Sequence, residues 1–176
     1  MSAASVNETQ AGYPEVMSAP VPSALAWSTE NCTVGRSMAV LGERWTFVVL
    51  REVFNGVRRF DDIRRHSGIP RQVLSNRLGF LVDQEILRRA PYRDAGARER
   101  HEYRLTPKGF DLYPVLVAIA DWGDRYLADP GGAPVEVAHL DCGGVVHAEL
   151  VCEHGHRVAD PRDVAPRPGP GVLPAG

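Results

Sequence analysis

Lysine, cysteine and long apolar runs are scarce in this sequence, and these shortages argue against a disulfide-stabilised fold and against a membrane-spanning segment. Lys108 is the single lysine among 20 cationic residues, a bias that GC-rich codon usage explains more simply than selection for forked phosphate binding by arginine. Three cysteines are too few for a disulfide framework. No apolar run approaches membrane-spanning length, and the first residues lack the basic-then-apolar pattern of a secretion signal. We therefore expect a cytoplasmic protein with no membrane partner, in which a cysteine is a thiol, a ligand or a sensor.

Sequence motifs of enzymes are missing as well. The chain has no nucleophile motif, no phosphate-binding glycine loop and no HExxH, and its three cysteines and six histidines are scattered. We therefore expect a protein that is not an enzyme and requires no cofactor.

The charged residues are unevenly distributed along the 176 residues. The formal net charge is −2, yet residues 31–127 hold 17 Arg and Lys against 12 Asp and Glu, while the two flanks hold 3 against 10. The length suits one well-cored domain with tails, and 44% hydrophobic residues is ordinary for a globular chain. A basic middle between acidic flanks favours an anionic partner for that middle.

Residues 59–84 are typical of two helices joined by a tight turn at His66-Ser67-Gly68-Ile69. In the second helix, apolar residues recur with a helical period at Val73, Leu74, Leu78, Leu81 and Val82. The residues left on its outer face are Arg71, Gln72, Ser75 and Asn76. Their donors and acceptors suit base edges and phosphates in a major groove. The stretch therefore predicts a helix-turn-helix that binds double-stranded DNA.

A β-hairpin is predicted directly after this motif. Two short strands, residues 86–92 and 99–105, flank the polar, Gly-containing turn of residues 93–98. A hairpin in this position is a wing, with Arg93, Arg98 and Arg100 at or near its tip. Thr106 and Pro107 then predict a new helix, as its N-cap and its first residue.

Three further helices are predicted around the motif. Residues 32–42 and 43–55 form the first two, and the second is apolar around much of its circumference, which predicts deep burial. The last helix carries a seam with heptad spacing, Leu112, Val115, Ile119, Trp122 and Tyr126. Pro114 predicts a kink or a late start of this helix. The seam packs either on its own domain or on a second subunit; we favour a homodimer, because these helices carry more apolar surface than a small winged domain can bury.

The ends of the chain differ from its middle. Residues 1–30 predict a disordered tail, residues 129–160 a small β-hairpin extension, and residues 161–176 a Pro/Gly-rich tail. The extension offers two pairs of zinc ligands in the manner of a degenerate zinc ribbon, His139 with Cys142 and Cys152 with His156. His147 is a further candidate ligand, and a hairpin held by packing alone is the alternative. The predicted fold is thus α+β, mainly α: a winged helix-turn-helix domain at residues 31–128, with N-terminal helices, a long C-terminal dimerisation helix and a small C-terminal β extension.

Six motifs follow one another between Cys32 and Tyr126. They are the cysteine before a short helix, GERWT at 42–46, RRFDDI at 58–63, IPRQVLSNRLGFL at 69–81, LTPKG at 105–109 and DWG at 121–123. In this order they resemble the HxlR-type winged helix-turn-helix transcriptional regulators. The tail is similar to an extension of some members, with HxxCG at 139–143, Cys152 and PGPG at 168–171. Gly79 departs from the family, which usually has a charged residue there.

The resemblance implies a homodimer on an inverted-repeat operator, with one recognition helix of each subunit in a major groove and one wing on the adjacent backbone or minor groove. The candidate DNA contacts are Arg71, Gln72, Ser75, Asn76, Arg77, Arg93, Arg98 and Arg100. Arg77 either binds phosphate or forms a structural ion pair with Asp61 or Asp62.

The signal that controls such a regulator has two candidate sites. Some relatives carry a redox-sensing cysteine at the position of Cys32, and a helix N-terminus favours the reactive thiolate; a small buried hydrophobe at the dimer interface is the alternative role. Trp45, Phe54, Trp122 and Tyr126 either belong to the core or line an effector pocket near the dimer interface. We therefore expect a sequence-specific regulator, more a repressor than an activator, that answers an oxidant or a small molecule. A ligand sensor without redox chemistry and a winged adaptor that does not bind DNA are the alternatives.

Overall fold

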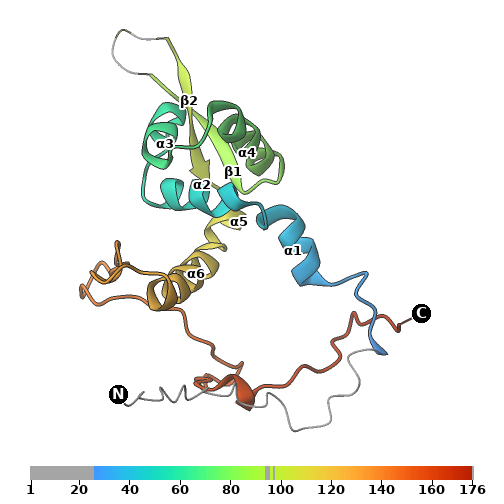
Figure 1. Cartoon of the computed structure of the whole chain (residues 1–176). Helices are drawn as coiled ribbons and strands as arrows, with labels where there is room; N and C mark the ends of the chain where they lie inside the picture. Colours follow the sequence, from blue (N-terminus) through green and yellow to red (C-terminus); the bar gives the residue numbers. More distant parts are fainter. Residues whose placement is uncertain (1–25, 94–95, 97, 176) are drawn as a thin grey trace, which may run out of the picture. The chain divides into compact units, whose positions relative to one another are not determined.

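A computed structural model describes residues 26–93, 96 and 98–175 (Figure 1). The chain divides into a main unit, Thr33–Ala148, and a small unit, of which residues 26–32 and 149–175 are described. The disordered tail predicted for residues 1–30 falls largely on residues 1–25, outside the described part. No helix in the described part is long and apolar enough to cross a membrane.

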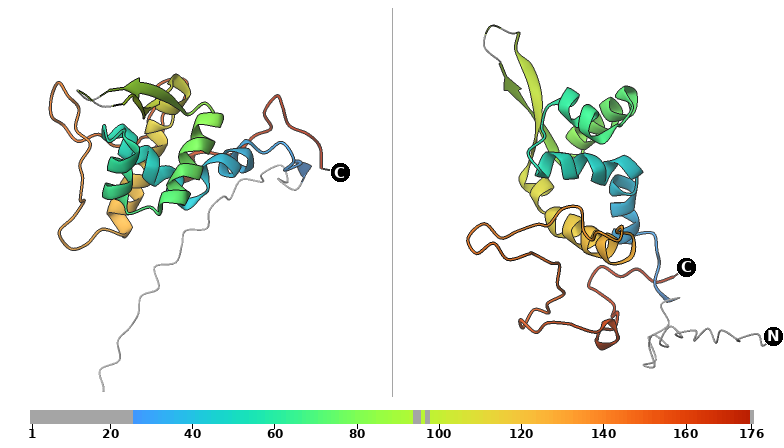
Figure 2. Two further views of the ribbon diagram at one scale, coloured as in Figure 1. Left: turned by 90° about the horizontal axis from the view of Figure 1, so that it is seen from above. Right: turned by 60° about the vertical axis from the view of Figure 1, so that its left-hand side comes forward.

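The main unit contains helices and one antiparallel hairpin. Its elements are α1 (Thr33–Leu41), α2 (Arg44–Phe54), α3 (Phe60–Ser67), α4 (Arg71–Asp83), β1 (Leu87–Tyr92), β2 (Arg100–Leu105), α5 (Pro107–Phe110) and α6 (Tyr113–Tyr126). Figure 2 shows the hairpin projecting past α3 and α4, away from α6. The prediction of a mainly helical chain with a two-stranded wing is confirmed.

The turn between α3 and α4 is stabilised by its own residues. Gly68 follows α3 with φ 70°, a left-handed conformation that glycine adopts without a Cβ penalty. The Ser67 hydroxyl donates to the Ile63 carbonyl (2.6 Å) and accepts from the Ile69 N–H (3.3 Å), so that the chain reverses with its polar groups paired. The helix-turn-helix predicted at residues 59–84 is confirmed.

The core lies between α2, α3, α4 and the base of the hairpin. Its fully or nearly fully buried side chains include Val49, Leu50, Val53, Ile63, Leu74, Leu78, Leu81 and Leu87. Burying one such side chain is worth about 1.5–3 kcal/mol. The apolar period predicted for α4 is therefore the face that fixes this helix to the domain.

A carboxylate is buried within this apolar core. The Glu52 side chain is fully buried, is paired with Arg51, and has one oxygen 2.6 Å from His66 Nδ1. An unpaired buried carboxylate would be costly, so Glu52 needs these partners. Because His66 lies at the end of α3, its contact with Glu52 also connects α2 to α3. The sequence predicted residues 43–55 as a deeply buried apolar helix and did not predict this contact between Glu52 and His66.

The wing pairs β1 with β2 from Leu87 opposite Leu105 to Tyr92 opposite Arg100. Leu87 and Ala90 are buried and hold the base of the hairpin against the core. The second strand begins at Arg100, one residue later than predicted. Residues 94, 95 and 97 of the predicted turn lie outside the described part.

The LTPKG segment clamps the chain where it leaves α4. Glu85 adopts a positive φ of 56°, and the Thr106 hydroxyl donates to its carbonyl at 2.6 Å. Lys108 Nζ donates to the Gln84 carbonyl at 2.8 Å. At Gly109 a Cβ atom would lie 2.3 Å from the Ile86 carbonyl oxygen, which explains the glycine at this position. Thr106 also caps α5, accepting from the Gly109 N–H, as predicted.

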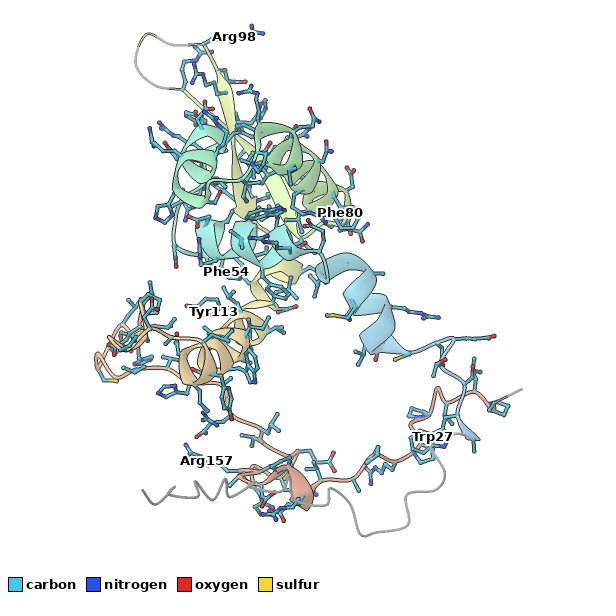
Figure 3. All side chains as sticks on the ribbon, viewed as in Figure 1. Trp27, Phe54, Phe80, Arg98, Tyr113 and Arg157 are labelled. Atoms are coloured by element: carbon cyan, nitrogen blue, oxygen red, sulfur yellow. The ribbon has the colours of Figure 1, made fainter. Side chains whose placement is uncertain are left out.

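The single last helix expected from the sequence is two helices. α5 ends at Phe110 and α6 starts at Tyr113, with Pro114 in its first turn, so the late start is the alternative that the structure confirms. The Tyr113 ring lies 4.6 Å from that of Phe54 (Figure 3), and Val117 is buried. α6 therefore packs on its own domain through Tyr113 and Val117, and of the predicted seam Leu112 alone packs against the core within the described residues.

The β-hairpin predicted for residues 129–160 does not form strands. This range, described throughout, has only isolated bridges, between Ala138 and Val145 and between Val151 and Arg157. The segment is exposed along nearly all its length, so pairing gains little from burial. Instead, Asp121 of α6 accepts hydrogen bonds from His147 Nδ1 (3.0 Å) and the Ala148 N–H (2.7 Å), which anchor the end of the main unit.

Candidate nucleic-acid interface

The outer face of α4 is polar and exposed, opposite the buried Leu74, Leu78 and Leu81. Arg71, Gln72, Ser75 and Asn76 are all exposed, as expected for a recognition helix. Gln72 Nε2 donates to Asn76 Oδ1 at 2.8 Å. The bond leaves the Gln72 carbonyl and one N–H unused, the acceptor and donor that an adenine edge requires.

A polar cleft lies between the start of α4 and the end of the wing strands that is next to the hairpin turn. The cleft has a volume of about 380 Å³ and is lined by Arg59, Phe60, Asp61, Asp62, Arg71, Tyr92, Arg100 and His101. The Arg71 guanidinium lies 5.3 Å from the Phe60 ring, and that of Arg59 lies 4.2 Å from the Tyr92 ring. Stacking on aromatic rings orients these cations. Asp62 is paired with Arg65, which offsets part of the negative charge.

Arg59 and His101 were not among the predicted contacts. Arg59 could have been singled out from the sequence, because it belongs to the RRFDDI motif. Its contact with Tyr92, however, depends on the position of the hairpin in the folded domain, which the sequence does not give. The arginines predicted for the wing, Arg93, Arg98 and Arg100, are exposed (Figure 3 labels Arg98).

Arg77 has a different neighbour from the one expected. Its Nε lies 2.9 Å from Glu43 Oε2 and its guanidinium 5.2 Å from the Phe80 ring, whereas the sequence suggested Asp61 or Asp62. The N–H is not aimed at the carboxylate, so the contact is an ion pair without a hydrogen bond. Glu43 also accepts from the Trp45 N–H as the N-cap of α2. With its side chain only 19% exposed, Arg77 joins α4 to the start of α2.

The predicted seam of α6 is open along most of its length. Val115, Ile119, Trp122 and Tyr126 are 41%, 45%, 58% and 62% exposed, whereas Leu112 packs against the core. Trp122 and Tyr126 contact each other, with ring centroids 5.4 Å apart. Val34 and Met38 of α1 are exposed as well. Exposed apolar side chains gathered on one helix face, as on α6, are a common mark of an interaction site.

The aromatic residues proposed to line an effector pocket are not gathered in one place. Trp45 and Phe54 pack against the core, while Trp122 and Tyr126 are exposed. An apolar groove does exist beside α1; none of these four aromatic residues lines it, but Leu112 of the predicted seam does.

The cysteine and histidine candidates occupy both units. Cys32 is exposed and directly precedes α1. In the main unit, Cys142 Sγ lies 3.4 Å from His139 Nδ1; in the small unit, the Cys152 N–H donates to the His156 carbonyl at 3.0 Å. Within the described ranges, no group of three or more His, Cys, Asp or Glu side chains is placed to hold a metal.

A polar helix exposed after a tight turn, beside an arginine-bearing hairpin, defines a winged helix-turn-helix protein that binds DNA. Residues 40–130 match the HxlR-like helix-turn-helix family, and the chain belongs to that family. Its members are transcriptional regulators, so the protein is not an enzyme and its partner is DNA.

Relatives and solved structures agree with this assignment. HTH-type transcriptional regulators of Mycobacterium tuberculosis and Mycobacterium bovis are each 45% identical over 149 residues, 85% of this chain and 93% of theirs. The candidate transcription factor PA1607 superposes with a TM-score of 0.68 at 31% identity, over 79% of this chain and 96% of its own. PA1374 from Pseudomonas aeruginosa, also 31% identical, gives a TM-score of 0.55 over 81% and 95%.

Proposed function

We propose that the protein is a homodimeric repressor that binds an inverted-repeat operator and releases it on a redox or small-molecule signal. The observation that carries the proposal is the exposed polar half of α4, next to the wing and free of any role in the core. Arg71, Gln72, Ser75 and Asn76 read base edges, while the wing arginines Arg93, Arg98 and Arg100 hold the backbone. Arg77 is left out of this set because it is tied to Glu43.

The homodimer is supported by the apolar face of α6. A second copy that covers Val115, Ile119, Trp122 and Tyr126 removes from water a surface that the described part of the chain leaves exposed. Dimerisation through α6 sets the spacing of the two recognition helices. A signal that favours another spacing lowers operator affinity by shifting the population of dimers.

Cys32 is the proposed site of an oxidant signal. Its thiol is exposed and lies at the N-terminus of α1, next to the exposed apolar residues of that helix. After mild oxidation, we expect a cysteine-dependent dimer on a non-reducing gel and weaker DNA binding. Both effects should be absent in Cys32→Ser. Unchanged gel mobility and DNA affinity in the oxidised wild type would exclude this role.

Zinc is proposed as an accessory ligand of the extension. The sequence of the extension contains four donors of the type that zinc prefers, His139, Cys142, Cys152 and His156. Metal analysis of protein purified without a histidine tag tests this directly. A zinc content well below one per chain would exclude it.

The operator is found by pulling down genomic fragments with the purified protein, followed by gel shifts on the bound promoter. Arg71→Ala should weaken binding by about 1–3 kcal/mol and relax sequence preference. Arg98→Ala with Arg100→Ala should flatten the slope of log affinity against log salt, because fewer counterions are released. Arg125→Ala is the matched control, since α6 lies at the end of the main unit away from the wing (Figure 2). No affinity for any duplex at low salt would instead favour an adaptor that does not bind DNA.

A further inference from the structure

An apolar groove lies where α1 joins the rest of the main unit, and DNA contact does not use it. Its volume is about 330 Å³, near the lower end of the range for small-molecule sites, roughly 300–1,000 Å³. Val40 and Leu41 of α1 form one wall, and Ile86 and Leu112 form the other. The walls are aliphatic, so they suit an alkyl chain or a flat ring equally well.

The charged residues of the groove have one sign. Arg36 and Lys108 both line it, and no Asp or Glu is among its lining residues. Lys108 Nζ donates one hydrogen bond, to the Gln84 carbonyl, and keeps two N–H donors for another acceptor. Apolar walls with two cations form the complement of a molecule that has an apolar body and one negative charge.

We propose that this groove binds an amphipathic carboxylate, with its apolar body against Val40, Leu41, Ile86 and Leu112 and its carboxylate between Arg36 and Lys108. The inference rests on the proposed function, because it names the class of molecule that serves as the signal.

The position of the groove connects such a ligand to the recognition helix. Ile86 follows α4 after Gln84 and Glu85, and its N–H donates to the Leu81 carbonyl at 2.9 Å. Lys108 holds the last turn of the same helix through the Gln84 carbonyl. A ligand that touches both residues and α1 therefore contacts at once the exit of α4 and a helix that carries exposed apolar residues of its own. If it binds better to dimers with another helix spacing, it lowers operator affinity.

A second copy of the chain is the competing occupant, and the charges argue against it. The exposed face of α6 is apolar and offers no negative charge to the groove. The cation of that helix, Arg125, would add a third positive charge to those of Arg36 and Lys108. The two acidic residues of α6, Asp121 and Asp124, line a separate cavity against the extension. A second α6 in the groove would therefore leave Arg36 and Lys108 without a counter-charge.

The test uses the full chain and three probes of equal length and different charge: octanoate, 1-octanol and octylammonium. Titration calorimetry should give octanoate the highest affinity, about tenfold above 1-octanol, with octylammonium weakest. Arg36→Ala should lower the affinity for octanoate several-fold, toward that for 1-octanol, with the remaining preference supplied by Lys108. Ser37→Trp should weaken both, because Ser37 lines the groove and a large ring fills it. Arg64→Ala, an exposed cation of α3 outside the groove, should behave like the wild type.

Octanoate should also release the operator from the wild type at lower concentrations than from Arg36→Ala. Equal affinity for the three probes, or no effect of Arg36→Ala, would overturn the proposal. So would failure of octanoate to bind combined with a loss of dimer in Ser37→Trp, since a second copy would then fill the groove. Gel shifts with and without octanoate separate failure of this inference from failure of the proposed function. If the protein binds its operator and octanoate has no effect, the groove is not the signal site. If the protein binds no DNA even at low salt, the proposed function itself is rejected.

Discussion

The recognition half of the main unit and its α6 helix use apolar residues in opposite ways. In α2, α3, α4 and the hairpin base, side chains such as Leu50, Ile63 and Leu78 are fully buried within one chain. In α6, Ile119 and Trp122 are about half exposed, although their spacing is as regular. Regular apolar spacing thus identifies an apolar helix face, but it does not say whether the rest of the same chain buries that face.

The largest effect is expected from the buried side. Leu78→Ala should lower the free energy of unfolding by about 2–5 kcal/mol, because a fully buried leucine leaves a cavity. Urea denaturation of the dilute protein measures this change. Ile119→Ala is the matched control, and at low protein concentration it should cost much less. Similar losses of unfolding free energy in the two variants would show that Ile119 is buried by its own chain, and would contradict the difference between α6 and the core.

Ile119→Asp should act on assembly instead of folding. A charge in the middle of the exposed face is costly to bury against a second copy, so the dissociation constant of the dimer should rise by about tenfold or more. Sedimentation measured over a range of concentrations reports this shift, and circular dichroism checks that the fold is kept. Arg125→Ala, on the same helix, should leave the dimer intact. An unchanged dimer in Ile119→Asp would remove this face from the interface.

Gly79 offers a smaller change of the opposite sign. A Cβ at this position of α4 has nothing within 4 Å, and its φ is not left-handed, so alanine fits without strain. Gly79→Ala should stabilise the protein by about 0.4–1 kcal/mol, because it restricts the unfolded chain. Thermal unfolding at constant protein concentration measures the gain. Gly68→Ala is the contrasting variant and should destabilise, since Gly68 has a positive φ. A lower melting temperature for Gly79→Ala would reveal a close contact at that site.

The smallest effect concerns the anchor of the extension on α6. The pKa of Asp121 is lowered, first by the hydrogen bond from the Ala148 N–H and then by His147. A carboxyl whose folded pKa is depressed stabilises the fold above its unfolded pKa of about 4, and this stability is lost as the pH falls through the folded value. The amide proton of Ala148 should report the titration by NMR with a midpoint below 4. Asp121→Asn should abolish it, and a midpoint at or above 4 in the wild type would contradict the anchor.

Much of the recognition half could be predicted because its signals are local. The period of Leu74, Leu78 and Leu81, the glycine of the turn, and the threonine before Pro107 each act within a few residues along the chain. The same locality placed the exposed residues of α4 on one face. The start of α6 was left open between a kink and a late start, since Pro114 permits both.

The missed features depend on residues far apart in sequence. Arg77 pairs with Glu43, and Glu52 with His66, only because the fold brings these positions together. The prediction of a β-hairpin in the extension was wrong for another reason. Apolar and polar residues alternate there as they do in strands, but the apolar side chains stay exposed, so strand pairing would bury little apolar surface. The groove beside α1 combines residues from α1, the exit of α4 and α5, and no short motif contains it.

The clamp at the exit of α4 has a practical consequence. Lys108 is the only lysine, so it is the only side-chain amine in the chain. An amine-reactive fluorophore would therefore label each subunit at one defined side chain, beside the groove and the last turn of the recognition helix. The same reagent at low dose becomes a footprint, because a carboxylate bound in the groove should protect Lys108, the one side-chain amine, from modification, while labelling of the N-terminal α-amine should be unchanged.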